Sequence, residues 1–529
     1  MIGGLLTTAG FTALRYRHRL VGSALPHPAG AGQVPPQRAL IVGAGEAGQL
    51  LAWRMQHQNG HYELIGFVDD DPEKVGLQIH GAPVWGAISH VSDVVARLQA
   101  DLIVIAMHEV GHERLNEIFD LCQTSTARIQ ILPDVMAHLA EGNGIEPLRD
   151  LTIEDLLGRP PREVDEAACR SLVAGRTVLV TGAAGSIGSE LCRQVTRYGP
   201  ERILALDQNE TGLYELALEL GGSALLLLVG DVSNEARMEA IWREHRPAVV
   251  FHCAAYKHVP ILEAFPGEAI RTNVQGTRTV AEMSRRWGTE RFVLISSDKA
   301  ACPINVMGAS KRVGELLTMA MQEAGTETTR FAVVRFGNVL GSRGSVVPTF
   351  EQEIAQGGPL TITHPHMRRY FMSIEEAVSL VIQAGAYTRG GDLFVLDMGE
   401  EVLIEHLAHK MIRLRGLRMG QDIEIEYTGV RPGEKLSEIL HCPLCEVLEP
   451  TRHPSILRMR NDNQPPSSAW LAIVEALIRL VDEAEEQELT AWLFDMAHFF
   501  CPEECEARTR AAGDEQPGLH TSPRMWYHK

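Results

Sequence analysis

Residues 178–191 read VLVTGAAGSIGSEL, and this stretch decides the fold that we predict for most of the chain. An apolar run ends at Thr181, glycines follow at three-residue intervals, and a helical apolar pattern begins among them. This order is typical of a strand, a tight turn and a helix that bind the pyrophosphate of a dinucleotide. Glycine suits the turn because a Cβ would hold the phosphates away from the backbone N–H groups. The residues that we expect at the pyrophosphate are Gly182, Gly185, Ser186, Ile187 and Gly188.

An acidic residue stands where proteins with this turn bind a ribose. The apolar run 203–206 ends in Asp207, about 20 residues beyond the glycines. A carboxylate there accepts hydrogen bonds from a ribose 2′-hydroxyl and repels a 2′-phosphate, so NAD is favoured over NADP. The expected cofactor site also includes Asp231, Val232, Ala254 and Ala255, which follow two further predicted strands.

The composition indicates an ordinary soluble globular protein. The 529 residues are 45% hydrophobic and 22% charged, which suits two or three domains with packed cores. A net charge of −19 argues against nucleic acid as the main partner, because phosphate neutralisation needs a basic surface. Nine cysteines without framework spacing suggest a reducing cytosol. The pairs Cys442 with Cys445 and Cys501 with Cys505 could form a four-thiolate zinc site, but their long separation favours buried thiols and no metal.

The first 37 residues are predicted to be a separate N-terminal segment and linker. Residues 1–14 are apolar and uncharged, and Arg15, Arg17 and Arg19 follow them. The run is shorter than the ~20 residues that a spanning helix needs, and a signal peptide carries its positive charge before the apolar run. Three interpretations stay open: the cytoplasmic end of a membrane helix, an interfacial anchor and a frayed terminus. We expect a cytoplasmic protein, with contact to the inner face of the cell membrane left open.

Residues 38–135 are predicted to form a first Rossmann-like unit. The stretch RALIVGAGEAGQLLAWRM at 38–55 combines a strand, glycines at 43, 45 and 48, and a helix. Asp69, Asp70 and Asp71 follow the next strand at the offset expected for a ribose. No cluster of acid, base and nucleophile stands out in this part of the sequence, so a binding or regulatory domain is the simpler interpretation. A polar, proline-containing linker is predicted at 136–175.

A larger, catalytic domain is predicted at 176–462. Apolar strands are expected at 177–181, 202–206, 224–229, 248–252, 291–296 and 331–336, with helical patterns between them. This alternation predicts an α/β fold with a doubly wound parallel sheet, whose ligands bind at the carboxyl ends of the strands. The looser pattern after the sixth strand predicts a smaller α/β substrate-binding lid. Two amphipathic helices are expected within 463–505, and a disordered tail at 506–529.

A second stretch, SSDKAACPINVMGASKR at 296–312, carries the predicted chemistry. It begins where the fifth strand ends and offers a hydroxyl, a carboxylate and an ammonium in Ser297, Asp298 and Lys299. Such a set is what proton transfer around a bound sugar requires. Met307 and Lys311 stand one helical turn apart in the helix that follows. The alternative is an N-cap cluster with surface charges.

The motifs of the chain give it a specific resemblance to a known family. They are similar to those of the large, membrane-associated nucleotide-sugar 4,6-dehydratases of polysaccharide and O-antigen biosynthesis, in the extended short-chain dehydrogenase/reductase superfamily. The resemblance covers about residues 38–460; the usual members begin with several membrane helices, of which this sequence shows at most a stub. The motifs are VTGAAGSIGSELCRQ, HCAAYKHVP, SSDKA, NVMGASKR, RFGNVLGSRGSVVP, RRYFMSIEEA and RPGEKLSE.

The resemblance implies roles for the residues of the second stretch. The superfamily's Tyr-x-x-x-Lys pattern is represented here by Met307 and Lys311, and methionine is the usual replacement in this subgroup. By the same resemblance Lys311 holds the nicotinamide ribose, and Ser297 handles the sugar 4-hydroxyl. Lys299 is then the base at C5 and Asp298 the acid at O6. These roles require a lowered lysine pKa and a raised aspartate pKa, and burial must contribute because adjacent charges alone would not do this.

The implied reaction is the dehydration of a UDP-sugar, with NAD as a cofactor that is regenerated in each turnover. UDP-N-acetylglucosamine is the expected substrate, and a UDP 4-keto-6-deoxy-N-acetylhexosamine for glycan synthesis is the expected product. A UDP-sugar epimerase on the same fold and a non-catalytic nucleotide-binding scaffold are the alternatives, and Met307 favours the scaffold. A homo-oligomer is expected. The residues expected at the substrate are Lys257, His258, Asn338, Arg343, Arg369, Arg431, Glu434 and Lys435.

Overall fold

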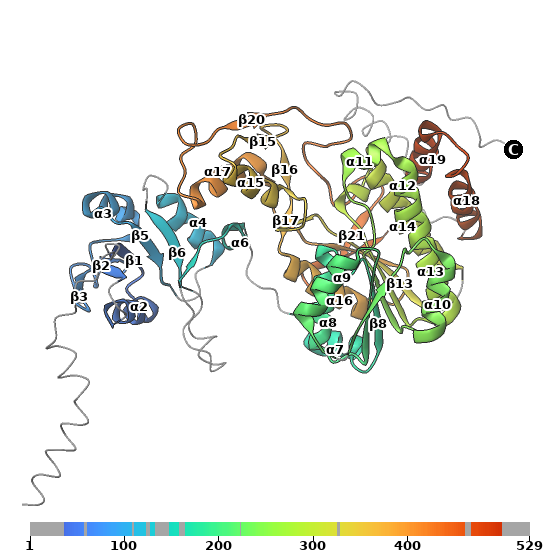
Figure 1. Ribbon diagram of the computed structural model, residues 1–529, viewed down its shortest axis with the longest axis horizontal. Helices are drawn as coiled ribbons and strands as arrows, with labels where there is room; N and C mark the ends of the chain where they lie inside the picture. The colour runs from blue at the N-terminus through green and yellow to red at the C-terminus, as the bar shows by residue number, and fades with distance from the viewer. Residues whose placement is uncertain are drawn as a thin grey trace, which may run out of the picture. The chain divides into compact units, whose positions relative to one another are not determined.

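The computed structural model describes residues 36–57, 61–107, 111–122, 127–132, 148–157, 164–222, 224–324, 328–460 and 467–499. Contacts divide the chain into two compact units: unit 1 is Met1–His108 with Ile129–Arg149, and unit 2 is Glu109–Arg128 with Asp150–Lys529. Each unit has a sheet of its own (Figure 1). Residues 1–35 and the predicted tail at 506–529 lie outside the described residues, and the predicted domain boundaries stay predictions.

Unit 1 contains a five-stranded sheet. Its strands and helices are β1 (Gln37–Val42), α2 (Glu46–His57), β2 (Tyr62–Val68), β3 (Gln78–Ile79), β4 (Ala82–Pro83), α3 (Val91–Leu98), β5 (Leu102–Ile105), β6 (Arg128–Ile131) and β7 (Arg149–Asp150). The sheet has the order β2-β1-β5-β6-β7, and β1 pairs in parallel with both β2 and β5. Leu40, Ile41 and Val42 of β1 are fully buried, which agrees with the unbroken apolar run that a central parallel strand needs.

Unit 2 contains a nine-stranded sheet, formed by β8 (Thr177–Thr181), β9 (Arg202–Asp207), β10 (Leu225–Val229), β11 (Val249–His252), β12 (Arg291–Ile295), β13 (Arg330–Arg335), β18 (Asp392–Leu396), β21 (Val447–Pro450) and β22 (Ile456–Arg460). The order is β10-β9-β8-β11-β12-β13-β18-β22-β21. The first seven strands are parallel to one another. β22 is antiparallel to β18, and β21 is antiparallel to β22. The chain runs outward in opposite directions from β8, so the crevice between β8 and β11 is the topological switch point, where ligands of such sheets bind.

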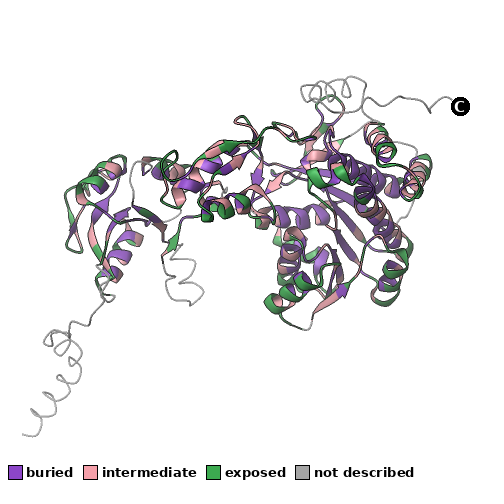
Figure 2. Ribbon diagram, turned by 45° about the horizontal axis from the view of Figure 1, so that its top comes forward, coloured by how far each residue is buried: buried purple, intermediate pink, exposed green. Residues whose placement is uncertain are grey.

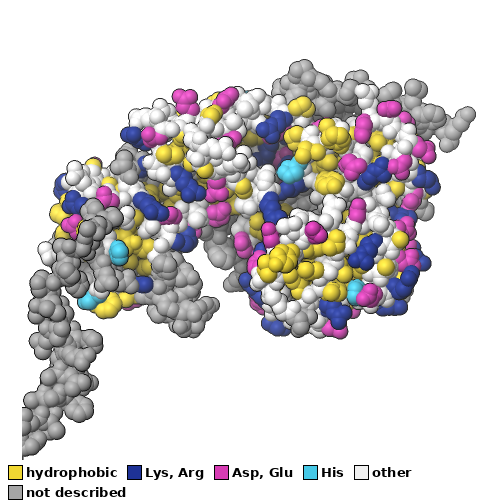
Figure 3. Space-filling view, in the orientation of Figure 1, with side chains coloured by type: hydrophobic (Ala, Val, Ile, Leu, Met, Phe, Trp, Pro, Cys, Tyr) yellow, Lys and Arg dark blue, Asp and Glu magenta, His cyan; other side chains and the backbone are white. Residues whose placement is uncertain are grey.

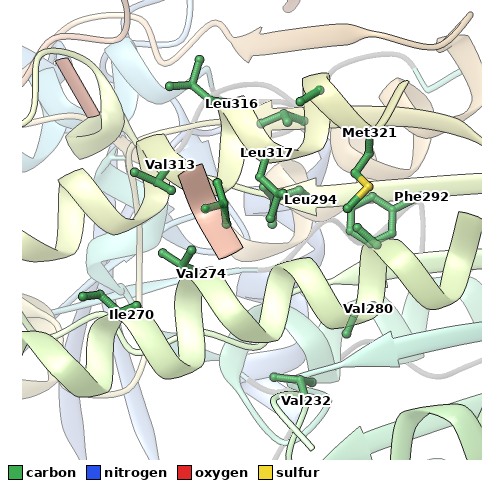
Figure 4. Close-up of a cluster of buried hydrophobic side chains, with 14 of the residues drawn as sticks. Val232, Ile270, Val274, Val280, Phe292, Leu294, Val313, Leu316, Leu317 and Met321 are labelled. Carbon is green, nitrogen blue, oxygen red and sulfur yellow. The ribbon is translucent and has the colours of Figure 1, made fainter. Parts of the chain in front are cut away.

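Helices cover both faces of this sheet (Figure 1). One face carries the core formed by α10 (Glu235–His245), α13 (Gly276–Trp287) and α14 (Val306–Glu323), and the other the core formed by α7 (Glu166–Val173), α8 (Ser186–Arg197) and α16 (Ile374–Tyr387). Figure 4 shows the first core, in which Leu317 lies beside Leu294 and Met321 beside Phe292. The other helices of unit 2 are α4 (His112–Leu121), α6 (Ile153–Leu157), α9 (Glu210–Leu220), α11 (Val259–Ala264), α12 (Pro266–Ala269), α15 (Val346–Ala355), α17 (Ile404–Leu414), α18 (Ser467–Leu480) and α19 (Glu486–His498).

The helix α14 is buried along most of its length (Figure 2). The two C-terminal helices, which the sequence predicted, pack against it on the side away from the sheet. Trp470 of α18 and Leu493 of α19 belong to the same core as α14. Arg278 Nε lies 2.5 Å from Glu475 Oε1, which ties α18 to α13. The C-terminal helices therefore help to hold the helix that carries Lys311.

A smaller α/β part follows the sixth strand. Its short strands pair as β14 (Asn338–Val339) with β17 (Phe371–Met372), β15 (Leu360–Ile362) with β20 (Ile425–Tyr427), and β16 (Arg368–Arg369) with β19 (Val402–Leu403). The predicted fold class is thus confirmed: two Rossmann-like sheets and a smaller α/β part. Each of the six predicted strands of unit 2 lies within one residue of its predicted bounds. The sequence did not predict that β18, β22 and β21 extend the same sheet.

Candidate active site

The glycine turn after β8 is as tight as the sequence predicts. Gly182 has φ +68°, and a Cβ there would lie 2.7 Å from Ala254 N. A Cβ on Gly188 would lie 2.1 Å from Gly182 O, so α8 packs directly on the turn. Gly185 is the N-cap of α8, and no side chain caps this helix end. The N–H groups at the start of α8 are therefore available to an anion, which a helix N-terminus favours.

Asp207 reaches back to the same turn from the end of β9. Its Oδ2 accepts a hydrogen bond from Ala184 N–H at 2.9 Å, and its Oδ1 accepts one from Asn209 N–H at 2.9 Å. Each carboxylate oxygen has a second lone pair, so both oxygens can still accept a hydrogen bond from a ribose hydroxyl. The geometry suits the predicted ribose contact.

The other predicted cofactor residues follow the next strands at the carboxyl edge of the sheet. Asp231 comes after β10, and its Oδ1 accepts hydrogen bonds from Ser233 N–H and Oγ at 2.8 Å each. Val232 is buried in the core shown in Figure 4. Ala254 and Ala255 lie just after β11, beyond Cys253. Ala254 closes the turn, because it is the residue that a side chain at position 182 would strike.

Lys311 reaches from α14 to the end of β12. Its Nζ donates a hydrogen bond to Ile295 O at 2.8 Å. Burial lowers the pKa of Lys311 to about 8, although Cys253 and Glu315 act in the opposite direction. The amine is thus held at the edge of the sheet where the cofactor is expected.

Ser297, Asp298 and Lys299 lie together at a short 3₁₀ turn after β12. Lys299 Nζ donates a hydrogen bond to Asp298 Oδ1 at 3.1 Å, and Ser297 Oγ donates one to the same oxygen at 2.8 Å. Asp298 N–H donates to Phe336 O at 2.9 Å, which ties the turn to the end of β13. Asp298 is fully buried, and its Oδ2 has no hydrogen-bond partner among the described residues. One carboxylate oxygen is therefore held by two donors, and the other is left to a proton or a substrate group.

Lys299 also contacts two residues from distant parts of the chain. Its Nζ donates to Asn338 Oδ1 at 3.3 Å and lies 3.6 Å from Glu438 Oε1. Glu438 is 2% exposed, and its Oε2 lies 3.4 Å from Lys435 Nζ. Glu438 was not predicted at the site from the sequence, although it is the last residue of the motif RPGEKLSE. Its charge within that motif was the one sign in the sequence that it could belong to the site. The distance along the chain between Glu438 and Lys299 does not predict that the two residues meet.

Two opposing effects act on the pKa of Lys299. Burial lowers it, while the carboxylates of Asp298 and Glu438 raise it and outweigh burial, so the pKa is raised above its usual value. This corrects the expectation of a lowered pKa. That expectation counted the effect of burial and missed Glu438. Lys299 is therefore an ammonium in the ligand-free protein.

The helix α14 begins directly beside Lys299. Asn305 Oδ1 accepts a hydrogen bond from Gly308 N–H at 2.7 Å and so caps the helix. A Cβ on Gly308 would lie 2.2 Å from Lys299 O, so this close approach requires glycine. Met307 is 4% exposed and belongs to the hydrophobic core. It therefore packs at this position and offers no group that could exchange a proton.

The residues expected at the substrate fall into two groups. In the first group, Arg369 Nη2 lies 3.4 Å from Glu434 Oε1, and Arg431 N–H donates to Glu434 Oε2 at 3.3 Å. Lys435 belongs to this group, since it contacts the carboxylate of Glu438 beside the catalytic turn. Arg369 and Lys435 are thus paired with glutamates near Lys299, whereas Arg431 contacts Glu434 through its backbone N–H.

Arg343, Lys257 and His258 form the second group, next to the glycine turn. Arg343 Nη1 donates a hydrogen bond to Ala184 O at 3.2 Å. Lys257 Nζ donates to Arg343 O at 2.7 Å, and the ring of His258 lies near Gly344. The described contacts of this group lead to the cofactor turn and not to Arg369.

A buried ion cluster, which was not predicted from the sequence, lies beneath the catalytic turn. Arg335 forms bidentate contacts with both Glu315 and Glu446, with shortest distances of 2.6 and 2.9 Å. Arg312 Nη1 lies 3.0 Å from an oxygen of each glutamate. Ser296 Oγ donates to Glu315 Oε1 at 2.7 Å. All four charged residues are almost fully buried, so the cluster links β13, α14 and the segment that carries Glu438.

The glycine turn of unit 1 resembles that of unit 2 with one difference. A Cβ on Gly43 would lie 2.7 Å from Ala106 O, and Ala44 N–H donates to Asp69 Oδ2 at 2.6 Å. Lys74 Nζ, however, lies 3.2 Å from both oxygens of Asp69. Burial raises the pKa of Asp69, but backbone N–H donors and Lys74 outweigh it and hold the pKa below its usual value. The acid expected at a ribose is therefore already paired with a lysine.

Two further predictions concern metals and membranes. Within the ranges that the structure describes, no group of three or more His, Cys, Asp or Glu side chains could hold a metal ion. Cys442 and Cys445 are described, but Cys501 and Cys505 lie outside the described residues. No helix in the described part of the chain has both the length and the apolar character needed to cross a bilayer.

Known proteins match both parts of the chain. Residues 178–461 match the polysaccharide biosynthesis protein family, and residues 5–133 match a CoA-binding domain. The capsular polysaccharide biosynthesis protein CapD of Staphylococcus aureus is 42% identical over 414 residues, which are 77% of this chain and 69% of CapD. An inverting UDP-N-acetylglucosamine 4,6-dehydratase of Campylobacter jejuni is 34% identical over 269 residues, 50% of this chain and 77% of that enzyme. The X-ray structure of Pen from Bacillus thuringiensis is 29% identical, with a TM-score of 0.50, and covers 59% of this chain and 100% of Pen.

The glycine turn at the switch point and the lysine of α14 define the class of protein. It is an enzyme of the extended short-chain dehydrogenase/reductase superfamily, of the nucleotide-sugar dehydratase and epimerase type. The chain belongs to the polysaccharide biosynthesis protein family, whose match spans more than half of its length.

Proposed function

We propose that this chain is an NAD-dependent 4,6-dehydratase and that its substrate is UDP-N-acetylglucosamine. The observation that carries the proposal is the 3.1 Å contact between Lys299 Nζ and Asp298 Oδ1 at the carboxyl end of a central strand. An acid and a base side by side can remove the C5 proton and protonate the departing 6-hydroxyl of one sugar ring. The 34% identity to a Campylobacter UDP-N-acetylglucosamine 4,6-dehydratase over half of the chain supports the choice of sugar.

The residues around the glycine turn fit NAD. Side chains at positions 182 and 188 would strike backbone atoms, so glycine keeps the turn narrow in front of the uncapped start of α8. Asp207 keeps lone pairs for a ribose, and the amine of Lys311 reaches the same edge of the sheet for the nicotinamide ribose. Bound NAD supplies the acceptor for a hydride from C4 and the donor of that hydride to C6.

Lys299 must lose a proton before it can act as a base. Its hydrogen bond to Asp298 offers a direct path, because transfer of one proton from Nζ to the carboxylate forms the base and the acid together. Lys299 then takes the proton from C5, and Asp298 gives its proton to O6, which leaves as water. This restores the ammonium and the carboxylate, so the pair returns to its starting state. We assign Ser297, whose Oγ donates to Asp298 at 2.8 Å, to the sugar 4-hydroxyl.

The diphosphate of the substrate is assigned to the cations beside Lys299. Arg369 and Lys435 are paired with Glu434 and Glu438 in the ligand-free chain, at 3.4 Å each. A diphosphate carries more charge than a carboxylate and would replace these glutamates as the partner. Asn338, which already contacts Lys299, is assigned to the sugar beside the catalytic pair.

The test is to incubate the purified chain with UDP-N-acetylglucosamine and to follow the product by mass spectrometry. Loss of one water from the UDP-sugar is the expected result. A product of unchanged mass that keeps its 6-hydroxyl would favour the epimerase. No product from any of several UDP-sugars would overturn the proposal and favour a nucleotide-binding scaffold.

A further inference from the structure

Arg335 is the last residue of β13, and its side chain is fully buried in the ion cluster. The guanidinium donates to Glu315 at 2.9 and 2.6 Å, to Glu446 at 2.9 and 3.4 Å, and to the backbone oxygen of Leu440 at 3.0 Å. These contacts use the five N–H donors that a guanidinium carries in one plane. The charged side chains on the face shown in Figure 3 meet water, whereas Arg335 is closed off from it. Arg335 therefore fixes the positions of three segments relative to one another.

One of these segments leads to the catalytic turn. Glu315 Oε1, which Arg335 contacts, also accepts a hydrogen bond from Ser296 Oγ at 2.7 Å. Ser296 directly precedes the catalytic turn. Within the turn, Asp298 N–H donates to the backbone oxygen of Phe336 at 2.9 Å, and Phe336 is the residue after Arg335. The catalytic turn is therefore held both to α14 and to the end of β13.

A second segment leads to Glu438. Between Glu438 and β21 the chain forms no helix or strand, so no ladder of backbone hydrogen bonds fixes its position. Leu440, two residues beyond Glu438, is held through its backbone oxygen by Arg335. Cys442 N–H donates to Glu446 Oε2 at 2.8 Å, and the same oxygen accepts from Arg335. The ion cluster thus anchors the backbone that carries Glu438.

Glu438 meets Lys299 where these anchors hold it, with 3.6 Å between Oε1 and Nζ. Burial, then the carboxylates of Asp298 and Glu438, and then Arg369 act on the pKa of this lysine. Lys435 contacts the other oxygen of Glu438 at 3.4 Å. The ion cluster itself consists of two arginines and two glutamates in mutual contact, so its charges largely cancel. A substitution that keeps these charges should therefore act on Lys299 through the position of Glu438.

We propose that Arg335 is a positioning residue of the reaction: it holds Leu440 so that the carboxylate of Glu438 stays against Lys299. The proposal rests on the function proposed above, because it concerns the lysine that acts as the base there. A role in stability alone would not require the contact between Arg335 and Leu440 to influence the reaction. The two roles can be separated by how the reaction depends on pH.

The test is a double-substitution cycle in the full chain, measured by the pH profile of kcat/KM. The proposed step needs the proton that Lys299 and Asp298 share, so kcat/KM falls at high pH where that proton is lost. Arg335→Lys keeps the charge but has three N–H donors and no planar fork, so it cannot hold both glutamates and Leu440 at once. Its falling limb is expected to move to lower pH by roughly 0.5–1 pH unit, as the carboxylate moves away from the lysine. In the Glu438→Gln background, Arg335→Lys is expected to cause no further shift.

Two further variants separate position from stability, and both keep the charge of the residue that they replace. Arg312→Lys is the matched control, because Arg312 Nη1 contacts the same two glutamates at 3.0 Å each. It weakens the ion cluster but leaves the contact between Arg335 and Leu440, so its falling limb is expected to stay in place. Glu446→Asp withdraws the carboxylate by one methylene group from Arg335 and from Cys442 N–H, and a smaller shift to lower pH is expected.

Circular dichroism shows which variants fold, and Glu446→Asp decides the proposal if Arg335→Lys does not. An unmoved limb in the deciding variant would overturn the proposal and leave Arg335 with a structural role alone. A further shift of similar size in the Glu438→Gln background would also overturn it, because Arg335 would then act by another route. So would an equal shift in Arg312→Lys, which would assign the effect to the whole cluster. If the unmodified chain forms no dehydrated product, the proposed function fails and this inference fails with it, whereas product with an unmoved limb overturns this inference alone.

Discussion

Lys299 Nζ lies 3.6 Å from Glu438 Oε1, although the two residues come from distant segments of the chain. Glu438 is 2% exposed, so its carboxylate acts on Lys299 with little screening by water. Together with Asp298 it raises the pKa of Lys299 against the effect of burial. The segment that carries Glu438 is therefore part of the candidate active site and sets the charge of its lysine.

The pH dependence of the reaction should report this relationship. The proposed step needs the one proton that Lys299 and Asp298 share, so kcat/KM should fall at high pH as that proton is lost, and a raised pKa of Lys299 places this fall at higher pH. Glu438→Gln removes a charge that raises the pKa of Lys299, so the falling limb should move to lower pH. The pH profile of kcat/KM measures the shift. Glu434→Gln is the control, because Glu434 pairs with Arg369 and should leave the limb in place. An identical limb in Glu438→Gln and in the unmodified enzyme would contradict the assignment.

Lys299→Ala should abolish dehydration and leave bound NAD in place. Loss of a general base typically lowers the rate by a factor of about 10²–10⁴. NAD should stay bound because the described contacts of Lys299 are with Asp298 and Glu438 and not with the glycine turn. Product formation is followed by mass spectrometry and bound NAD by absorbance after denaturation. Lys435→Ala removes a nearby lysine without a proton-transfer role, so it should raise KM for the UDP-sugar more than it lowers kcat. Unimpaired turnover by Lys299→Ala would show that the base is another residue.

Gly182→Ala should prevent NAD binding. The substitution would place a Cβ 2.7 Å from Ala254 N, at φ +68°. Gly199→Ala is a matched control, since Gly199 has φ +70° but a Cβ there would meet no atom of the described residues within 4 Å. The control should cost about 1–2 kcal/mol of stability from the left-handed backbone alone and should keep NAD binding. Calorimetric titration with NAD distinguishes the two variants, and equal NAD affinity in both would mean that the turn tolerates a side chain.

Glu446→Ala should destabilise unit 2 strongly. It removes a carboxylate that both Arg335 and Arg312 contact inside the protein, and breaking a buried ion cluster in this way costs about 3–5 kcal/mol. Glu449→Ala removes a surface partner, since Glu449 lies 3.1 Å from Arg460 and both side chains are exposed. The control should change the free energy of unfolding by no more than about 1 kcal/mol. Urea unfolding measures the free energy of unfolding of both variants. A loss of stability in Glu446→Ala as small as that in Glu449→Ala would show that the ion cluster contributes little to the stability of unit 2.

The sequence predicted those features that depend on local patterns. The unbroken apolar runs placed six strands of unit 2 within one residue of their bounds, because a strand buried on both faces needs such a run. The glycines at 182 and 188 marked the turn, because no other residue fits so close to backbone atoms. Ser297, Asp298 and Lys299 are adjacent in the chain, so their common position after β12 followed from the strand prediction alone.

Contacts between distant segments were decided only by the tertiary structure. Glu438 meets Lys299, Arg343 turns to the glycine turn instead of the predicted substrate group, and Glu446 completes a buried ion cluster. No spacing along the chain predicts these contacts, because each depends on how loops return across the edge of the sheet. The pKa of Lys299 also depends on the tertiary structure. Its neighbour Asp298 is visible in the sequence, whereas the burial of Lys299 and its contact with Glu438, which also affect its pKa, exist only in the folded protein.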